Sequence, residues 1–140
     1  MVKTDHPIIV VDDDPDFCDI YMHILENKGY RAICFTNAEQ ALKKMSEEKP
    51  LLVITDLMMS SLDSGFSFAH TIRDDSRFTA VPVIIVTAIG KKLGIDFTPQ
   101  NQDELAVMYA DAFFAKPVSP DVLIAKIEEL VDKNIKEDLS

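Results

Sequence analysis

Short, uninterrupted apolar runs recur along this sequence, and they limit the folds available to it. Runs that are rich in β-branched side chains and lack polar residues are typical of strands buried on both faces of a sheet. Such sheets are usually parallel, because the helices that connect their strands cover both sides. The expected strands lie at 8–11, 31–35, 51–55, 83–86 and 113–115.

Helical patterns alternate with these runs. Asp14 is placed to cap a helix that begins at Pro15, a residue suited to a first turn, and that ends at Gly29. The segment Thr36-Asn37-Ala38-Glu39 resembles a capping box at the start of a second helix. The apolar residues on one face of that second helix are Ala38, Ala41, Leu42 and Met45.

Further helices are expected later in the chain. A short one runs from Phe66 to Arg73, and a long amphipathic one begins at Ser119-Pro120-Asp121 and continues to about Lys133. The segment 88–112 is less regular, with one helix expected near 103–109. The residues expected to face inward from the last helix are Val122, Leu123, Ile127, Leu130 and Val131.

Strands that alternate with helices indicate βαβ units, a parallel sheet and helices on both of its faces. Right-handed crossovers leave few ways to order such strands. We therefore expect an α/β fold of the flavodoxin-like, doubly wound type, (βα)5, with five parallel strands in the order 2-1-3-4-5. At 140 residues the chain fits one domain, with its core at about 7–133 and an acidic tail at 134–140.

Charge and composition exclude several classes of partner. The net charge of −10 argues against direct binding of nucleic acid, because the phosphate backbone favours clustered Lys and Arg. The N-terminus shows no apolar signal core, and no apolar run approaches the roughly 20 residues that cross a bilayer. We expect a cytoplasmic protein with no membrane contact. Cys18 and Cys34 could pair in principle, but we expect them to be reduced, buried and inert.

Polar residues stand at the carboxyl ends of the expected strands. In a parallel sheet these ends share one edge, and ligands bind at that edge. The side chains therefore come together from distant parts of the sequence into one small site. The residues concerned are Asp12, Asp13, Asp56, Thr87 and Lys116.

Three carboxylates, a hydroxyl and an ammonium group at one place indicate phosphoryl chemistry with a divalent cation. Without a cation at least one carboxylate would have a raised pKa, since the three repel one another. Mg²⁺ suits a site with few carboxylates and a phosphoryl oxygen as a further ligand. Asp56, centred between the others, is expected to be the nucleophile and phosphoacceptor. Asp12 and Asp13 hold the metal ion in this interpretation, while Lys116 and Thr87 contact phosphoryl oxygens.

Four motifs resemble, in order and over about 8–131, the receiver domains of bacterial two-component response regulators. They are Val10-Val11-Asp12-Asp13-Asp14-Pro15, Ile54-Thr55-Asp56-Leu57-Met58-Met59, Val86-Thr87-Ala88 and Ala115-Lys116-Pro117. The resemblance implies a switch rather than an enzyme. A histidine kinase or a phosphotransfer protein would donate the phosphoryl group to Asp56, output would pass through protein–protein contacts, and a homodimer is one implied assembly.

The resemblance also assigns roles that the strand ends alone do not. It implies that the backbone carbonyl of Met58 joins the metal ligands and that the Lys116–Pro117 peptide bond is cis. It implies that Phe113 is an aromatic switch residue that fills space when Thr87 moves inward. It further implies that Met58 and Ile89 influence water attack on the phosphoryl group.

Two other ion or phosphate sites fit the acidic triplet less well. A haloacid-dehalogenase-type phosphatase also begins with a strand and Asp-x-Asp, which would make Asp12 the nucleophile, but Pro15 and Asp16 continue that motif poorly. An EF-hand fails because Phe17 and His23 occupy the positions that require Gly and Glu.

The sequence departs from the receiver family at two places. Ser60 stands where the family usually has proline, and the loop to Gly65 is one residue longer, which favours the alternative of a pseudo-receiver that binds partners without accepting phosphate. Thr87 and Lys116 are 29 positions apart, longer than usual by roughly two helical turns. This second departure puts dimerisation by the usual mode in question.

We predict a long-lived phosphoryl group on Asp56. Met58 and Ile89 cannot orient a water molecule, and such positioning help is worth ~10²-fold in rate. The measurement is loss of label from purified phosphorylated protein with no phosphatase present. Loss within seconds would contradict the prediction.

Overall fold

Five parallel strands form one sheet in the computed structural model, which describes residues 6–56, 64–87 and 109–139. The strand order is β2-β1-β3-β4-β5, so the expected order 2-1-3-4-5 is confirmed. The strands are β1 (Ile8–Val11), β2 (Ala32–Phe35), β3 (Leu52–Thr55), β4 (Val83–Thr87) and β5 (Ala112–Ala115).

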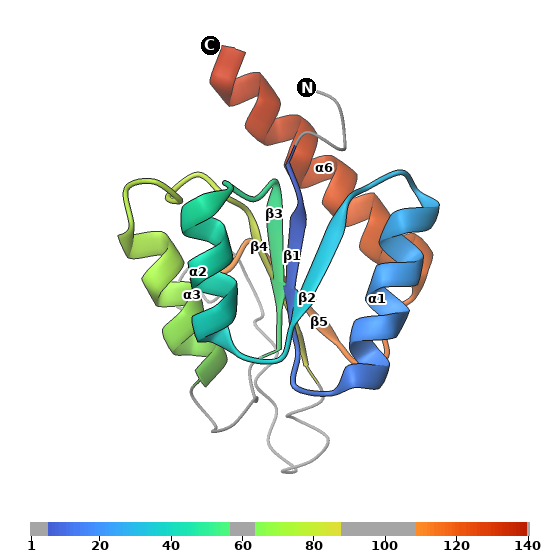
Figure 1. Ribbon diagram of the computed structural model, residues 1–140. Helices are drawn as coiled ribbons and strands as arrows, with labels where there is room; N and C mark the ends of the chain where they lie inside the picture. The colour runs from blue at the N-terminus through green and yellow to red at the C-terminus, as the bar shows by residue number, and fades with distance from the viewer. Residues whose placement is uncertain (1–5, 57–63, 88–108, 140) are drawn as a thin grey trace.

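Helices cover both faces of this sheet (Figure 1). On one face lie α1 (Pro15–Asn27) and α6 (Pro120–Leu139), and on the other lie α2 (Ala38–Glu47) and α3 (Ser64–Asp74). The sheet divides the core accordingly, because successive side chains of a strand point to opposite faces. In β1, Ile8 and Val10 pack in the cluster under α1 and α6, whereas Ile9 and Val11 pack in the cluster under α2 and α3.

The helix ends follow from the residues at them. The Asp14 carboxylate accepts a hydrogen bond from the Asp16 backbone N–H at 3.0 Å and so caps α1. Beyond the other end of α1, Gly29 has a φ of 86°, a conformation that glycine adopts without a Cβ clash. At α2 the cap is Asn37, which accepts from the Gln40 N–H at 2.9 Å. The N-cap of α2 is therefore Asn37, one residue after Thr36, the first residue of the expected capping box.

The last helix differs from the expectation in two respects. It continues to Leu139 rather than ending near Lys133, because neither glycine nor proline interrupts the segment. Val122 is 49% exposed, so its expected inward position is wrong. The inner face of α6 instead contains Leu123, Ile124, Ile127 and Val131, with Leu130 partly buried.

The expectation of two reduced cysteines is also wrong. A disulfide joins Cys18 of α1 to Cys34 of β2, with their Cα atoms 5.8 Å apart. α1 packs against the strand that follows it, and this brings the two residues together.

None of the helices in the described ranges is long and apolar enough to cross a membrane. The helix expected near 103–109 falls almost entirely outside the described residues.

Candidate functional site

Backbone hydrogen bonds carry the sheet one residue beyond its strands and position the polar residues there. The Asp12 N–H donates to the Phe35 carbonyl at 3.0 Å, and the Asp56 N–H donates to the Val11 carbonyl at 3.1 Å. At the other side of the sheet the Lys116 N–H donates to the Thr87 carbonyl at 3.0 Å. The positions of Asp12, Asp56 and Lys116 are thus set by the pairing of the strands that precede them.

The Lys116 ammonium group joins two of the carboxylates. Its Nζ lies 2.8 Å from Asp12 Oδ2 and 2.8 Å from Asp56 Oδ2, although 104 residues separate Lys116 from Asp12. Asp12 is 1% exposed, Asp56 6% and Lys116 7%. Buried charges require such pairing, because an unpaired charge in the interior costs several kcal/mol.

The third carboxylate completes a group that suits a metal ion. Ligand oxygens of Asp12, Asp13 and Asp56 lie within 4.8 Å of one another, and Asp13 alone of the three is exposed. Oxygen ligands of this kind fit a hard divalent cation, and the exposed side leaves room for retained water. The donor set therefore fits the metal that the sequence predicts.

Burial and hydrogen bonding act in opposite directions on the charges of this site. Burial raises the pKa of Asp12, and hydrogen bonds from Lys116 and from the Asp14 backbone N–H only partly offset that effect. Burial also disfavours the Lys116 ammonium, but its hydrogen bonds to Asp12 and Asp56 outweigh the burial and raise its pKa. Lys116 is consequently a permanent positive charge, while Asp12 is a carboxylate that a cation would stabilise.

Thr87 and Phe113 lie on adjacent strands near the same edge. Thr87 ends β4 and is 3% exposed. Phe113, on β5, is half-buried and aligns with Ile85, two residues before Thr87. The expected cis bond between Lys116 and Pro117 is confirmed. Met58 and Ile89, the other two predicted site residues, lie outside the described residues.

Phe17 is a site residue that the sequence did not reveal. Its ring centroid lies 3.9 Å from Lys116 Nζ, and its ring packs near that of Tyr21 with centroids 6.3 Å apart. The face of an aromatic ring attracts a cation, so Phe17 adds a stabilising contact to the ammonium besides those of the two carboxylates. The only sequence signal for this contact was an aromatic residue four positions after Asp13. That signal is not specific, because an aromatic residue there also fits the apolar face of a helix.

A doubly wound parallel sheet with an acidic cluster and a lysine at its carboxyl edge defines a class of regulatory α/β proteins, and comparison with known proteins identifies the family. The family model described as "Response regulator receiver domain" matches residues 8–128. The chain therefore belongs to the response regulator receiver domains of two-component signal transduction.

Individual relatives agree with this assignment. The chain is 32% identical to "Response regulator Rre1" of Synechocystis sp. over 89% of this chain and 51% of that protein. It is 29% identical to "Alkaline phosphatase synthesis transcriptional regulatory protein PhoP" of Bacillus subtilis, over 91% of this chain and 49% of that protein. The chain thus spans about half the length of these two relatives.

Solved structures show the same fold. A "response regulator receiver domain protein (CheY-like)" from Methanospirillum hungatei superposes with a TM-score of 0.75 at 26% identity, covering 94% of this chain and 98% of that chain. A response regulator receiver domain protein from Clostridium thermocellum gives a TM-score of 0.76 at 23% identity, with coverage of 96% and 99%. The second of these supports the fold alone.

We predict that Phe17→Leu slows phosphorylation of the protein by about fivefold, because Leu fills the space without attracting the ammonium, a contact worth about 1 kcal/mol. The measurement is the rate of adduct formation with acetyl phosphate and Mg²⁺, read by intact mass. Phe17→Tyr is the matched control and should keep the wild-type rate. Equal rates for the Leu and wild-type proteins would contradict a role for the ring.

We predict that Asp12→Asn stabilises the metal-free protein by about 1 kcal/mol at neutral pH. Burial raises the folded-state pKa of Asp12. The contribution of Asp12 to the free energy of unfolding of the wild-type protein is therefore fully present below the ordinary carboxyl pKa and is lost as pH rises through the folded-state pKa. The gain should therefore vanish at about pH 3, where Asp12 is protonated in both states. Urea unfolding in chelator at both pH values measures the difference, and an equal gain at both would contradict this explanation.

Proposed function

We propose that this receiver domain accepts a phosphoryl group on Asp56 from a histidine kinase or a phosphotransfer protein, with Mg²⁺ as cofactor. The observation that carries the proposal is the Lys116 ammonium, which bridges Asp12 and Asp56 next to the three-carboxylate group. A lysine buried among acids that also face a cation site is suited to bind the dianionic phosphoryl group of an aspartyl phosphate.

The chemistry follows from the positions of the side chains. A carboxylate oxygen of Asp56 attacks phosphorus and forms an O–P bond, while the P–N bond of the donor phosphohistidine breaks and leaves the electron pair on the imidazole. Lys116 Nζ moves its hydrogen bond from Asp56 to a phosphoryl oxygen. Mg²⁺, held by Asp12, Asp13 and Asp56 with the Met58 carbonyl that the family implies, would supply charge neutralisation.

The response to phosphorylation is proposed to pass through Thr87 and Phe113. The phosphoryl group attracts the Thr87 hydroxyl, which leaves space near β4 that the half-buried Phe113 ring fills. Phosphorylation then biases two states of the surface near β5 and α6, and partner proteins read that difference. On this view the domain assists only its own phosphorylation and dephosphorylation and is not an enzyme acting on other substrates.

The output partners that we propose are other proteins. PhoP of Bacillus subtilis is named as a transcriptional regulatory protein, and this chain covers 49% of it. For the chain itself we propose output through protein–protein contacts, in the cytoplasm, with the net charge of −10 opposing direct contact with nucleic acid.

We predict that acetyl phosphate and Mg²⁺ form one phosphoryl adduct on the wild-type protein, seen by intact mass. Asp56→Asn, which keeps the side-chain volume but removes the nucleophilic carboxylate, should form none. Chelation of Mg²⁺ should abolish the wild-type adduct. Absence of any wild-type adduct, or an adduct on Asp56→Asn, would contradict the proposal and favour a pseudo-receiver.

A further inference from the structure

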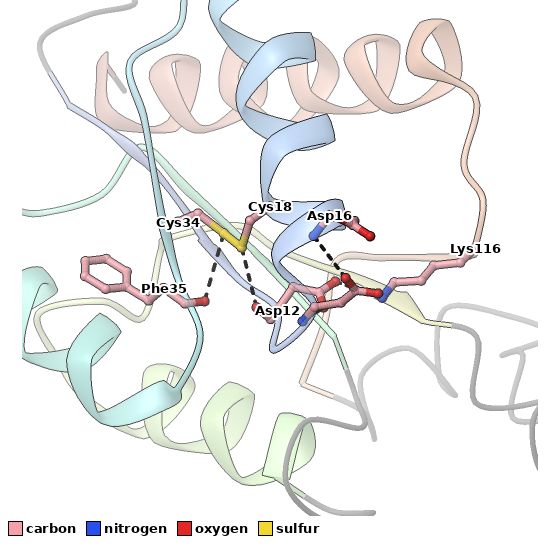
Figure 2. The surroundings of a disulfide bond; sticks show 7 residues. Asp12, Asp16, Cys18, Cys34, Phe35 and Lys116 are labelled. Atoms are coloured by element: carbon pink, nitrogen blue, oxygen red, sulfur yellow. Dashed lines mark hydrogen bonds and ion pairs between the residues drawn. A yellow bond between two sulfur atoms is a disulfide. The ribbon is translucent and has the colours of Figure 1, made fainter.

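The Cys18–Cys34 disulfide lies directly behind the acidic site. Figure 2 shows the bond between α1 and β2, with Asp12 beside it and Lys116 beyond. Cys34 aligns with Val10 in the sheet, two residues before Asp12. Cys18 lies in the first turn of α1, where its N–H donates to the Asp14 carbonyl at 3.2 Å. The cross-link therefore ties the first turn of α1, which directly follows the loop that carries Asp12 and Asp13, to β2, the neighbour of β1.

One sulfur contacts the backbone of a site residue. Cys18 Sγ lies 3.4 Å from the carbonyl oxygen of Asp12. A thiol at this position can donate a weak hydrogen bond to that oxygen, whereas a disulfide sulfur has no proton to donate. The residue before Cys18 is Phe17, whose ring contacts Lys116. A change in the redox state of the sulfurs therefore acts beside the Asp12 carbonyl and in the same helical turn as Phe17, whose ring contacts Lys116.

The two cysteines differ in burial. Cys18 is 9% exposed, whereas Cys34 is half-buried. In the reduction step that we infer, a thiolate attacks Cys34, the less buried of the two residues, forms a mixed disulfide there and releases Cys18 as a thiolate that takes up a proton. A second thiolate then attacks the external sulfur of the mixed disulfide and releases Cys34. Two electrons pass from a dithiol to the protein, and the dithiol becomes a disulfide.

We propose that Cys18 and Cys34 form a reversible redox site, reduced by a dithiol protein or a small thiol, that controls metal binding and phosphorylation at the adjacent carboxylates. The second half of this inference rests on the proposed function of Asp56. Disulfides that occur in a reducing cytoplasm are usually transient and redox-sensing rather than structural, which favours a reversible role in the proposed location.

The direction of the effect follows from the restraint. In the oxidised protein the acidic loop is held on one side by the hydrogen bond from Asp12 to Phe35 and on the other by the disulfide. Reduction replaces the covalent restraint with only the weak hydrogen bond that the Cys18 thiol can donate to the Asp12 carbonyl, so the first turn of α1 is freer to shift. A site held in its binding geometry binds more tightly, because less order must be gained on binding. The oxidised form is therefore the better acceptor.

The test compares the two redox states of the full chain. Wild type is oxidised or reduced, its thiols are counted by alkylation and mass, and Mg²⁺ is titrated by calorimetry before phosphorylation with acetyl phosphate. Cys34→Ala retains the Cys18 thiol without its partner and is the permanent counterpart of the reduced state. The double variant Cys18→Ser/Cys34→Ser controls for effects of the reductant elsewhere.

Reduced wild type and Cys34→Ala should both bind Mg²⁺ about fivefold more weakly than the oxidised protein, and the double variant should not respond to reductant. A disulfide that resists reduction in the folded protein would overturn the inference, as would equal Mg²⁺ affinity and equal phosphorylation in both states. If neither state forms an adduct while Mg²⁺ affinity still changes with redox state, the redox site stands and the proposed function of Asp56 fails.

Discussion

The ammonium group of Lys116 is the contact on which the acidic site depends. Two carboxylates that are almost fully buried, Asp12 and Asp56, lie 2.8 Å from it. Without a positive charge at this point, burial and mutual repulsion would drive a proton onto at least one of them. Lys116 keeps the acids together in the absence of a metal ion, and its replacement would leave buried charge uncompensated at the cost of several kcal/mol.

The fold supplies the geometry that this contact requires. The parallel strands all end at one edge of the sheet, so the residues that follow β1, β3 and β5 meet there although they are far apart in sequence. The ladder hydrogen bonds that continue to Asp12, Asp56 and Lys116 fix the backbone at each of these positions. Precise placement of charges is thereby a consequence of strand pairing, and the two core clusters on either side of the sheet hold the strands in place.

Most of the fold and most of the site could be predicted from the sequence, because the signals are local. Buried runs mark the strands, and the site residues stand next to those runs. The disulfide, the contact of Phe17 with Lys116 and the exposure of Val122 could not be predicted. Each depends on how far a helix is rotated about its axis and how close it lies to its neighbours, and an apolar pattern leaves that rotation uncertain by about one residue.

The unequal exposure of the acids has a kinetic consequence. Asp13 is open to solvent, while Asp12 and Asp56 are enclosed. The outer carboxylate can attract a hydrated cation at long range, since its field extends into water. Asp12 and Asp56 can bind the cation only after water has been displaced. Lys116 then shares these two carboxylates with the cation. In the proposed Mg²⁺ site, Asp13 would thus set the rate of cation binding, and the enclosed acids would set the rate of cation release.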